Sequence, residues 1–226
     1  AQVYNCLCDP VTRKRLESIR TLIIGGGEVS YTLEQEIRQL PHAVYATFGM
    51  TETITHIALR RINGPDPEEL YEALPGITFS TDNRGCLVVH APYISREPVV
   101  TNDLVEMTGN RAFTWRGRID HVINRGGQKL VPEEIEKMLA PHIDRRFFIG
   151  ALPDPKFGEL PVLVVESAGS DSDDQFFFLQ LVEKYVPKNE RPARIIIIGR
   201  FLETPGGKVN RRETLRLMNS GSCSTP

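Results

Sequence analysis

One segment just past the middle of the chain limits the possible folds and functions more than any other. It places Arg118 and Asp120 two residues apart, continues with a short apolar run and the pair Gly126-Gly127, and reaches a helix start at Pro132. Proline suits the first position of a helix, and the two glutamates behind it favour the positive end of the helix dipole. A protein does not need this combination simply to stay folded. The segment therefore indicates a hinge that also carries ligand contacts.

The residues before this segment predict a layered α/β portion. An apolar run at Leu22–Ile24 leads into three glycines, helical spacing follows over Thr32–Leu40, and Ala43–Phe48 is again apolar and β-prone. Strand, glycine loop, helix and strand in this order are typical of α/β layers. From Ile77 to Trp115 the pattern changes to short β-prone runs between turn residues, which predicts a small β-rich subdomain. Its expected strands are Cys86–His90, Pro98–Val100 and Ala112–Trp115.

A compact α+β unit is expected after the hinge. The predicted division is therefore 1–119 for a core portion and 120–226 for a C-terminal unit. The elements predicted for this unit are a helix from Pro132, strands at Arg146–Ala151, Pro161–Ser167 and Arg194–Gly199, and helices at Asp174–Tyr185 and Arg211–Met218.

The composition excludes several classes of protein. The chain has 226 residues, of which 40% are hydrophobic and 25% charged, as is typical of a globular protein. Its formal net charge of -2 argues against a general nucleic-acid binder. No apolar run approaches the roughly 18 residues that a membrane-spanning helix requires, and the first residues lack a signal-peptide pattern. Cysteines 6, 8, 86 and 223 have no usual zinc spacing, so we expect free thiols in a reducing cytoplasm.

Two more segments combine glycine with chemically active side chains. Residues 47–53 read Thr-Phe-Gly-Met-Thr-Glu-Thr, and residues 205–211 read Pro-Gly-Gly-Lys-Val-Asn-Arg. Any one of these three motifs alone would be a weak signal. In this order along one chain they resemble the motifs of the adenylate-forming enzymes, the superfamily of acyl-CoA synthetases, peptide-synthetase adenylation domains and luciferases.

The resemblance implies an architecture. The chain is expected to hold the C-terminal part of the family's large nucleotide- and acid-binding core domain, followed by the mobile C-terminal lid domain. The family's Ser/Thr/Gly-rich phosphate loop, which ends in a lysine, is not found ahead of glycines 25–27. We therefore expect only the C-terminal portion of the family here, and it stays open whether this portion catalyses a reaction by itself.

The resemblance also implies a reaction. A carboxylate attacks the α-phosphate of ATP to give an acyl-adenylate and pyrophosphate, and the thiol of coenzyme A then displaces AMP. Because the first step brings two anions together, it needs Mg²⁺ and cationic side chains. By resemblance, Glu52 binds Mg²⁺, Thr51 hydrogen-bonds the α-phosphate, and Lys208 bridges the carboxylate and the α-phosphate. A solvated glutamate at a strand end and a lysine beside a glycine turn are the structural alternatives.

For the nucleotide, the resemblance implies contacts from three places in the core portion. Phe48 would lie near the adenine ring, and Asp103 would accept hydrogen bonds from both ribose hydroxyls, although Asn102 departs from the family's usual Thr-Gly-Asp. The glycine loop would lie along the adenine and the acyl pocket. Plain turns are the alternatives at the loop and at Asp103. The loop residues are Gly25, Gly26 and Gly27.

For the lid, the resemblance implies a rotation about Asp120 after adenylation, absorbed by a few backbone dihedral angles. Arg118 would contact the ribose or hold the lid against the core. In the rotated position, Gly126 and Gly127 would line a narrow channel for the pantetheine arm of coenzyme A, because no side chain obstructs there.

The stretch after Glu52 narrows the choice of acid. Residues 53–61, the run Ala73–Gly76 and the short connection from there to the hinge resemble the o-succinylbenzoate–CoA ligases of menaquinone biosynthesis. Their substrate is an aromatic dicarboxylate, for which a cation or hydroxyl groups in the pocket would be suitable. The candidate pocket residues are Thr53, Thr55, His56 and Arg60.

Two alternative functions fit the same motifs. An adenylation domain that loads a separate carrier protein would carry all three, and so would a non-catalytic fragment that only binds nucleotide or coenzyme A. Binding of coenzyme A would disfavour the carrier-loading enzyme, and binding without turnover would favour the fragment. The sequence leaves the oligomeric state open.

Overall fold

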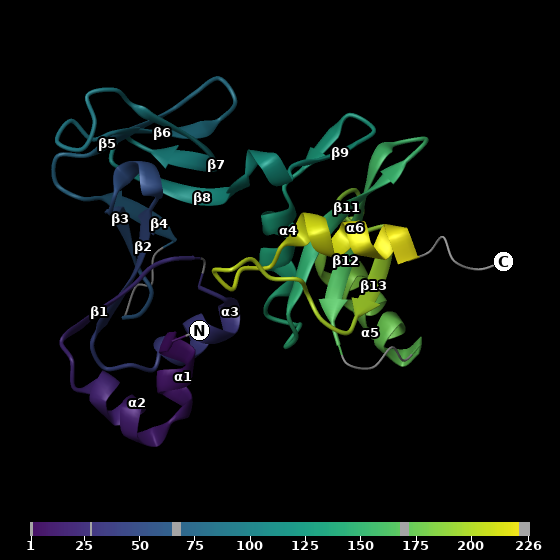
Figure 1. Cartoon of the computed structure of the whole chain (residues 1–226), viewed down its shortest axis with the longest axis horizontal. Coiled ribbons are helices and arrows are strands. Elements are labelled where there is room, and N and C mark those ends of the chain that lie inside the picture. The colour runs from purple at the N-terminus through teal and green to yellow at the C-terminus, as the bar shows by residue number, and fades with distance from the viewer. Residues whose placement is uncertain (1, 28, 65–68, 168–171, 222–226) are drawn as a thin grey trace. The chain divides into compact units, whose positions relative to one another are not determined.

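The chain folds into two compact units in the computed structural model, which describes residues 2–27, 29–64, 69–167 and 172–221 (Figure 1). The first unit is residues 1–116 and the second is residues 117–226. The predicted division at 119/120 lies close to this boundary, so the hinge segment opens the second unit.

The first unit contains the predicted strand–glycine loop–helix–strand series. Its helix ends at Ile37, before Pro41, and the strand that follows this helix begins at Ala43 as expected. In the described part of the chain, the elements of this unit are α1 (Gln2–Cys8), α2 (Pro10–Glu17), β1 (Thr21–Ile24), α3 (Tyr31–Ile37), β2 (Ala43–Gly49), η1 (Thr51–Thr53), β3 (His56–Arg61), β4 (Leu70–Ala73), β5 (Thr78–Thr81), β6 (Cys86–His90), β7 (Val99–Thr108) and β8 (Ala112–Arg118).

One eight-stranded sheet runs through this unit, with the strand order β1-β2-β3-β4-β8-β7-β6-β5. The β1–β2 pair is parallel, whereas β2–β3, β3–β4 and β4–β8 are antiparallel. The predicted α/β and β-rich portions therefore share a sheet. The β7 strand is longer than predicted, because its side chains alternate between a face packed on the core, with Val105 and Met107, and a more exposed face with Glu106 and Thr108.

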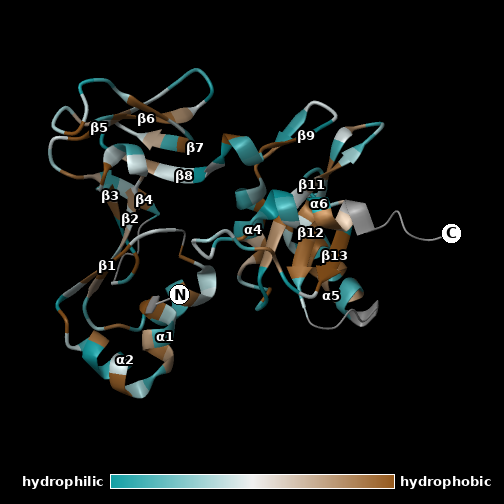
Figure 2. Cartoon of the chain, viewed as in Figure 1, coloured by the Kyte–Doolittle hydropathy of each residue, from teal (hydrophilic) through white to brown (hydrophobic). Residues whose placement is uncertain are grey.

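Two apolar clusters stabilise the first unit (Figure 2). One joins α1, α3 and β2 through buried side chains that include Leu7, Ile37 and Val44. The other is built on the strands around Phe113, which is fully buried, and Phe48 packs against it. Because burying one large apolar side chain stabilises a fold by about 1.5–3 kcal/mol, the second cluster firmly anchors the end of β2.

The second unit matches its predicted order of elements. Its α4 helix begins at Pro132, and its strands β11, β12 and β13 overlap the three predicted ones. The described elements are η2 (Ile119–His121), β9 (Ile123–Arg125), β10 (Gln128–Leu130), α4 (Pro132–Leu139), β11 (Phe147–Asp154), β12 (Gly158–Glu166), α5 (Ser172–Tyr185), β13 (Arg194–Ile198) and α6 (Arg211–Gly221).

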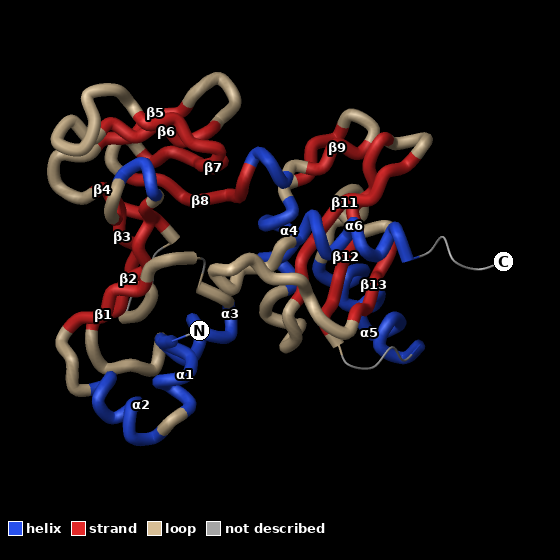
Figure 3. Tube along the Cα trace, in the orientation of Figure 1, coloured by secondary structure: helices blue, strands red, loops and turns tan. Residues whose placement is uncertain are grey.

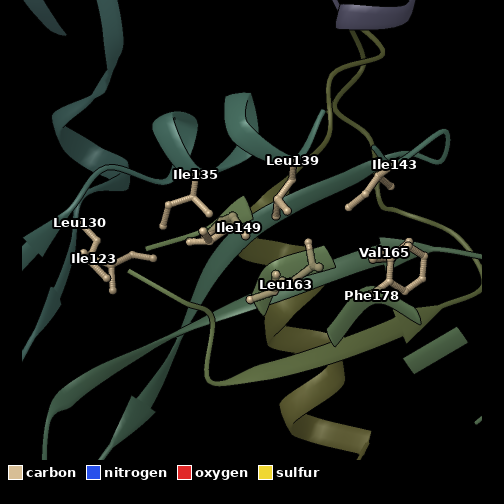
Figure 4. Close-up of a cluster of buried hydrophobic side chains, with 11 residues drawn as sticks. Ile123, Leu130, Ile135, Leu139, Ile143, Ile149, Leu163, Val165 and Phe178 are labelled. Atoms are coloured by element: carbon tan, nitrogen blue, oxygen red, sulfur yellow. The ribbon is translucent and has the colours of Figure 1, made fainter. Parts of the chain in front are cut away.

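The sheet of the second unit has the order β10-β9-β12-β11, with β13 parallel to β12. Alternate residues on its strands face opposite ways. Ile149 and Leu163 pack with α4 and α5, and Figure 4 shows Ile135 and Leu139 of α4 turned toward these strands. Phe148 and its neighbours on the other face pack with α6. The predicted fold class, an α/β core portion with a β-rich part followed by a compact α+β unit, is confirmed.

Some features are not found among the residues that the structure describes. None of their helices is long and apolar enough to cross a membrane. Their His, Cys, Asp and Glu side chains form no group of three or more that could hold a metal ion. Cys6, Cys8 and Cys86 are free thiols, and Cys223 lies outside the described residues.

Candidate functional site

Thr51 and Glu52 lie on η1, a single exposed 3-10 turn directly after β2. Within the described residues, neither side chain has a hydrogen-bond or ion-pair partner. The chain doubles back tightly here, because a Cβ atom at Gly49 would lie 2.7 Å from the carbonyl oxygen of Thr55 and 2.8 Å from Cα of His56. Only glycine fits that approach, so Gly49 sets the geometry that presents Thr51 and Glu52.

The Thr53 hydroxyl holds this loop together from inside. It is fully buried, accepts a hydrogen bond from the Met50 N–H at 3.1 Å, and lies within donating distance of the carbonyls of Met50 (3.0 Å) and Thr55 (2.9 Å). This gives Thr53 a structural role, while its predicted role in the acid pocket is untested. These bonds fix the backbone next to Thr51 and Glu52, the two residues that precede Thr53.

Ile54 carries backbone strain next to these residues. Its φ is +64°, at the centre of a γ-turn that the Thr55 N–H closes onto the Thr53 carbonyl at 2.6 Å. A β-branched residue with positive φ is an outlier, and such strain persists only where the surroundings determine the conformation. The Ile54 side chain is 83% exposed, so the fold does not gain from burying it. The loop from Gly49 to His56 is therefore a rigid platform.

Phe48 is anchored in the core beneath this loop. Its ring meets the rings of Tyr71 and Phe113 edge-on, with centroid separations of 5.6 Å and 5.1 Å. Only a part of the ring is exposed, so a contact with adenine would have to use that part. The adenine role predicted for Phe48 stays a prediction.

The glycine loop after β1 has local structural reasons for its first two residues. A Cβ atom at Gly25 would lie 2.6 Å from Thr47 Oγ1 on β2, and Gly26 has a φ of +94°. Gly25, Gly26 and Gly27 are all exposed. A plain turn accounts for this geometry, and the predicted contact with adenine and acid remains to be tested.

Asp103 lies on β7 and is held by the neighbouring strand. One of its carboxylate oxygens accepts a hydrogen bond from the indole N–H of Trp115 at 3.0 Å, and its own N–H donates to Thr101 Oγ1 at 3.0 Å. Arg84 donates to the Thr101 carbonyl at 2.9 Å and to Asn102 Oδ1 at 3.1 Å. Asn102, the departure from the family pattern, therefore has a structural function.

The hinge segment is packed more closely than its sequence indicates. Gly117 is buried, and a Cβ atom there would lie 2.5 Å from Glu133 Oε2 and 2.7 Å from Val131 Cγ1. Arg118 donates to Asp120 Oδ2 at 2.9 Å, and both side chains are about half exposed. Gly117 is thus the residue that the packing requires at the unit boundary, and the hinge role of Asp120 stays a prediction.

Gly126 and Gly127 form the two-residue turn of a β-hairpin. Arg125 on β9 pairs with Gln128 on β10, and the φ angles of the two glycines are +58° and +92°. Positive φ at both central positions is what a tight hairpin that follows the strand twist requires. Gly126 also donates to the Phe157 carbonyl at 2.8 Å. The turn accounts for the glycine pair, whereas the pantetheine channel remains untested.

Lys208 lies near the tip of the loop between β13 and α6, drawn in tan in Figure 3. The loop doubles back on itself, because the Thr204 N–H donates to the Lys208 carbonyl at 2.7 Å and Glu203 pairs with Val209. Gly207, with a φ of +75°, makes the reversal. The Lys208 side chain is exposed and makes no ion pair within the described part of the chain.

Charged side chains that are buried or partly buried hold the base of this loop. Arg211, three residues after Lys208, donates to both oxygens of Glu136 on α4 at 2.7 Å and 2.9 Å. Glu133, whose side chain is 5% exposed, lies 3.6 Å from Arg211 and 2.5 Å from the His121 ring. The four side chains connect the hinge segment, α4 and the start of α6 within the second unit.

This cluster shifts the titration of one carboxyl group. Burial raises the pKa of Glu136 to about 7, although Arg211 and the Ile149 N–H both favour its charged form. The nearby Glu133 carboxylate adds to the rise. Glu136 therefore changes charge near neutral pH while it holds Arg211.

The remaining pocket candidates differ in accessibility. Thr55 and His56 are exposed, and the Thr55 hydroxyl lies 3.2 Å from Nδ1 of His56. Arg60 is mostly buried and forms an ion pair with Glu34 of α3. Its guanidinium also lies over the Tyr71 ring, 5.7 Å from the centroid. Arg60 thus has a carboxylate partner inside the protein. The roles of Thr53, Thr55, His56 and Arg60 in an acid pocket stay predictions.

Sequence reasoning gave no supporting role to Arg84, Trp115, Glu136 or Arg211. Trp115 and Asp103 are 12 residues apart, and Arg211 and Glu136 are 75 apart, so each contact depends on tertiary structure. The hairpin at the glycine pair could have been found, because two glycines between short β-prone runs are a strong hairpin signal.

The comparisons with known proteins agree on one family. No family model matches the chain. The 2-succinylbenzoate–CoA ligase of Lactococcus lactis is 24% identical over 214 residues, which cover 87% of this chain and 46% of that protein. The chain thus spans about half the length of the curated relatives it matches.

Solved structures match over nearly the whole chain. An acyl-CoA synthetase (AMP-forming)/AMP-acid ligase II-like protein from Dyadobacter fermentans is 36% identical with a TM-score of 0.53, covering 96% of this chain and 63% of that one. The o-succinylbenzoate coenzyme A synthetase of Bacillus subtilis, in complex with ATP and magnesium, has a TM-score of 0.68 at 19% identity, covering 91% of this chain and 50% of that one. In sequence and fold, the chain therefore corresponds to the C-terminal portion of the adenylate-forming family.

Proposed function

We propose that this chain supplies part of the nucleotide site and the lysine-bearing lid of an acid–CoA ligase that works through an acyl-adenylate, with o-succinylbenzoate as the acid. One observation carries the proposal. Thr51, Glu52 and Lys208 are exposed and without side-chain partners in the described residues, while the residues around them are buried, strained or clamped. Polar groups held ready in this way are what stabilisation of developing charge requires.

Adenylation joins two anions. A carboxylate oxygen of the acid attacks the α-phosphorus of ATP, a new P–O bond forms, and the bond to the β-phosphate bridging oxygen breaks as pyrophosphate leaves. The Lys208 ammonium offsets the negative charge of both reactants, and the Thr51 hydroxyl donates to an α-phosphate oxygen. The clamped base of the Lys208 loop supports this role, because an ammonium group stabilises charge best when it is already in position.

Glu52 fits a magnesium site of the kind that ATP-dependent enzymes use. Mg²⁺ is commonly bound through one or two carboxylates together with substrate phosphates, rather than by a complete protein cage. A single exposed carboxylate next to Thr51 meets that requirement. When bound, Mg²⁺ supplies neutralisation of the phosphate charge. The related synthetase of Bacillus subtilis was solved with ATP and magnesium.

Thioester formation uses the second unit. The sulfur of coenzyme A attacks the acyl carbon, a C–S bond forms, and the C–O bond to AMP breaks so that AMP leaves with the electron pair. We assign the pantetheine arm to the hairpin at Gly126 and Gly127, where a Cβ atom at Gly127 would meet nothing within 4 Å. Rotation about the segment that contains Asp120 brings this hairpin to the acyl-adenylate.

The accessible pocket candidates are Thr55 and His56. Their hydroxyl and imidazole groups are exposed beside the rigid loop and can hydrogen-bond the second carboxylate of an aromatic dicarboxylate. Thr53 and Arg60 have partners within the protein, so we assign them to the support of the loop and of the sheet. The match to 2-succinylbenzoate–CoA ligases supports the choice of acid.

The test is a product assay on the natural polypeptide that contains this chain. The protein is incubated with ATP, Mg²⁺, coenzyme A and a panel of carboxylic acids that includes o-succinylbenzoate, and AMP and thioester are followed by mass spectrometry. We expect a thioester with o-succinylbenzoate that is lost in Lys208→Ala. Lys188→Ala, which removes another exposed lysine of the same unit, is the matched control and should leave the rate unchanged.

The alternatives give different results. A thioester from another acid would keep the mechanism and reject o-succinylbenzoate. Acyl-adenylate and pyrophosphate formed from acid and ATP, without any transfer to coenzyme A, would favour a carrier-loading adenylation domain. Binding of AMP or coenzyme A in a calorimeter, without AMP production from any acid, would leave only a non-catalytic binding module.

A further inference from the structure

We propose that Trp115 is a positioning residue for Asp103 and thereby sets the preference of the nucleotide site for ribose. The inference rests on the proposed function, in which Asp103 accepts hydrogen bonds from the ribose hydroxyls. It adds a residue on a neighbouring strand whose indole N–H orients that carboxylate at 3.0 Å.

The indole group is suited to this task. Its ring packs against the cluster around Phe113, and its only polar atom donates to Asp103 Oδ1. A large ring fixed by packing cannot follow the carboxylate, so the carboxylate must adopt the orientation that the N–H favours. Because a carboxylate can accept about four hydrogen bonds, one indole N–H does not compete with two ribose hydroxyls.

The backbone of the same segment is fixed separately. Arg84, in the turn before β6, donates to the Thr101 carbonyl at 2.9 Å and to Asn102 Oδ1 at 3.1 Å, and is itself held by Asp82 at 2.8 Å. The Asp103 side chain is oriented in addition by its own contacts. Among these, the N–H of Trp115 makes a hydrogen bond to a charged group, which is stronger than a bond between neutral groups.

The sheet places this pair on the face that also carries Phe48. Trp115 and Phe113 are two residues apart on β8, so their side chains share one face, and Phe48 contacts Phe113 with a centroid separation of 5.1 Å. On β7, Asp103 and Val105 share a face in the same way, and Val105 packs against the same cluster. Asp103, proposed to bind the ribose, and Phe48, proposed to lie near the adenine, are thus on the same face of the sheet in the first unit.

The test compares two ligands that differ only in the ribose hydroxyls. Calorimetric titrations with AMP and with 2′,3′-dideoxy-AMP give a ratio of affinities for the natural polypeptide and for its variants. Trp115→Phe removes the donor and part of the ring. Trp115→benzothienylalanine keeps the fused ring and replaces the N–H by sulfur, so that packing and hydrogen bonding are separated. Met107→Ala, which trims the same apolar cluster without touching Asp103, is the control.

We expect both Trp115 variants to lose about 3- to 10-fold in affinity for AMP, the range of one typical hydrogen bond, because the ribose must then orient a carboxylate that Trp115 no longer holds. Both should bind the dideoxy ligand unchanged. Met107→Ala should preserve the ratio. A ratio in the benzothienylalanine variant equal to that of the unaltered protein would overturn the role of Trp115 while the nucleotide site stands. No preference for AMP in the unaltered protein, with Asp103→Asn also without effect, would reject the proposed nucleotide site and this inference together.

Discussion

The loop that carries Thr51 and Glu52 and the loop that carries Lys208 are held in opposite ways. The first, from Gly49 to His56, is rigid through contacts inside itself: a buried hydroxyl, a strained γ-turn and a glycine under its own backbone. The second, from Phe201 to Asn210, is a backbone hairpin whose hydrogen bonds join its two arms, and its ends are anchored to other elements by an ion pair and by hydrogen bonds to side chains.

This difference has a functional meaning under the proposed reaction. A site for magnesium and phosphate is most effective when its ligand groups are held in fixed positions. Hydrogen bonds and backbone geometry within the loop hold them in this way. A lysine on a lid must move as a unit and still arrive in one orientation, which a clamped base allows. The first loop should therefore respond to steric changes, and the second to changes of charge and pH.

Removing the clamp should have the largest effect. Arg211→Ala leaves the partly buried Glu136 and the buried Glu133 without their guanidinium. Breaking a fully buried pair lowers the free energy of unfolding by about 3–5 kcal/mol, and we expect a somewhat smaller loss here because Arg211 and Glu136 are partly exposed. We expect amide hydrogen exchange at residues 203–210 to accelerate, while exchange at residues 53–55 stays unchanged. Arg212→Ala, on the exposed side of the same helix turn, is the control. Equal acceleration in both variants would show that the guanidinium of Arg211 is not the clamp.

The second-largest expected effect is a pH dependence of stability that is present in the second unit and absent from the first. Folded Glu136 has a pKa of about 7, whereas the unfolded chain has the ordinary value of 4.5, so between these pH values the folded state holds the extra proton. The free energy of unfolding of the second unit should therefore fall as pH rises from 4.5 to 7, by about 3 kcal/mol from this group.

Glu136→Gln tests this contribution, because other carboxyl groups titrate alike in both proteins. The difference in unfolding free energy between the original protein and the variant, measured by hydrogen exchange in β11 and β12, should change across pH 4.5–7 and be constant above about 8. Parallel pH profiles would contradict a raised pKa at Glu136. The strands of the first unit should show no difference at any pH.

A steric change should act on the first loop only. In Gly49→Ala the new methyl group would meet backbone atoms at 2.7 Å and 2.8 Å, which cannot move aside cheaply, so we expect a loss of about 1–3 kcal/mol in unfolding free energy. Gly206→Ala is the matched change in the Lys208 loop, where the nearest atom lies 3.9 Å away, and it should be close to neutral. Denaturant titration compares the two, and equal losses would contradict the contrast between the loops.

The smallest effect should be a gain. Ile54→Gly relieves the positive φ, worth about 1–2 kcal/mol, against about 0.5–1 kcal/mol of added chain entropy, so we expect a net stabilisation of at most about 1.5 kcal/mol. Val100→Gly removes another exposed β-branched residue, this one from ordinary strand backbone, and should destabilise instead. If both variants lose stability, the γ-turn at Ile54 is not strained.

The sequence was informative wherever short-range patterns determine structure. The β6 strand has the bounds predicted for it, and α4 begins at Pro132 as its proline and glutamates indicate. The helices α1 and α2 were not predicted. For α2 the reason is that the helix buries none of its residues and so has no apolar stripe. The β3 strand was interpreted only as part of the acid pocket.

The candidate sites were predictable as motifs but not as geometry. Thr51, Glu52 and Lys208 were singled out because their motifs resemble those of the adenylate-forming enzymes, and the structure gives each an exposed position on a supported loop. Their supports could not be predicted, because Trp115 reaches Asp103 only through the pairing of two strands, and Arg211 reaches Glu136 only through packing of α6 near α4.

The most direct test of the central claim isolates the first chemical step. Exchange of labelled pyrophosphate into ATP, measured with o-succinylbenzoate and Mg²⁺ but without coenzyme A, reports acyl-adenylate formation alone. The account predicts acid-dependent exchange in the natural polypeptide and a fall of about 10²- to 10³-fold in Lys208→Ala, as for the loss of one group that stabilises transition-state charge. Exchange in Lys208→Ala at the rate of the unaltered protein would contradict it.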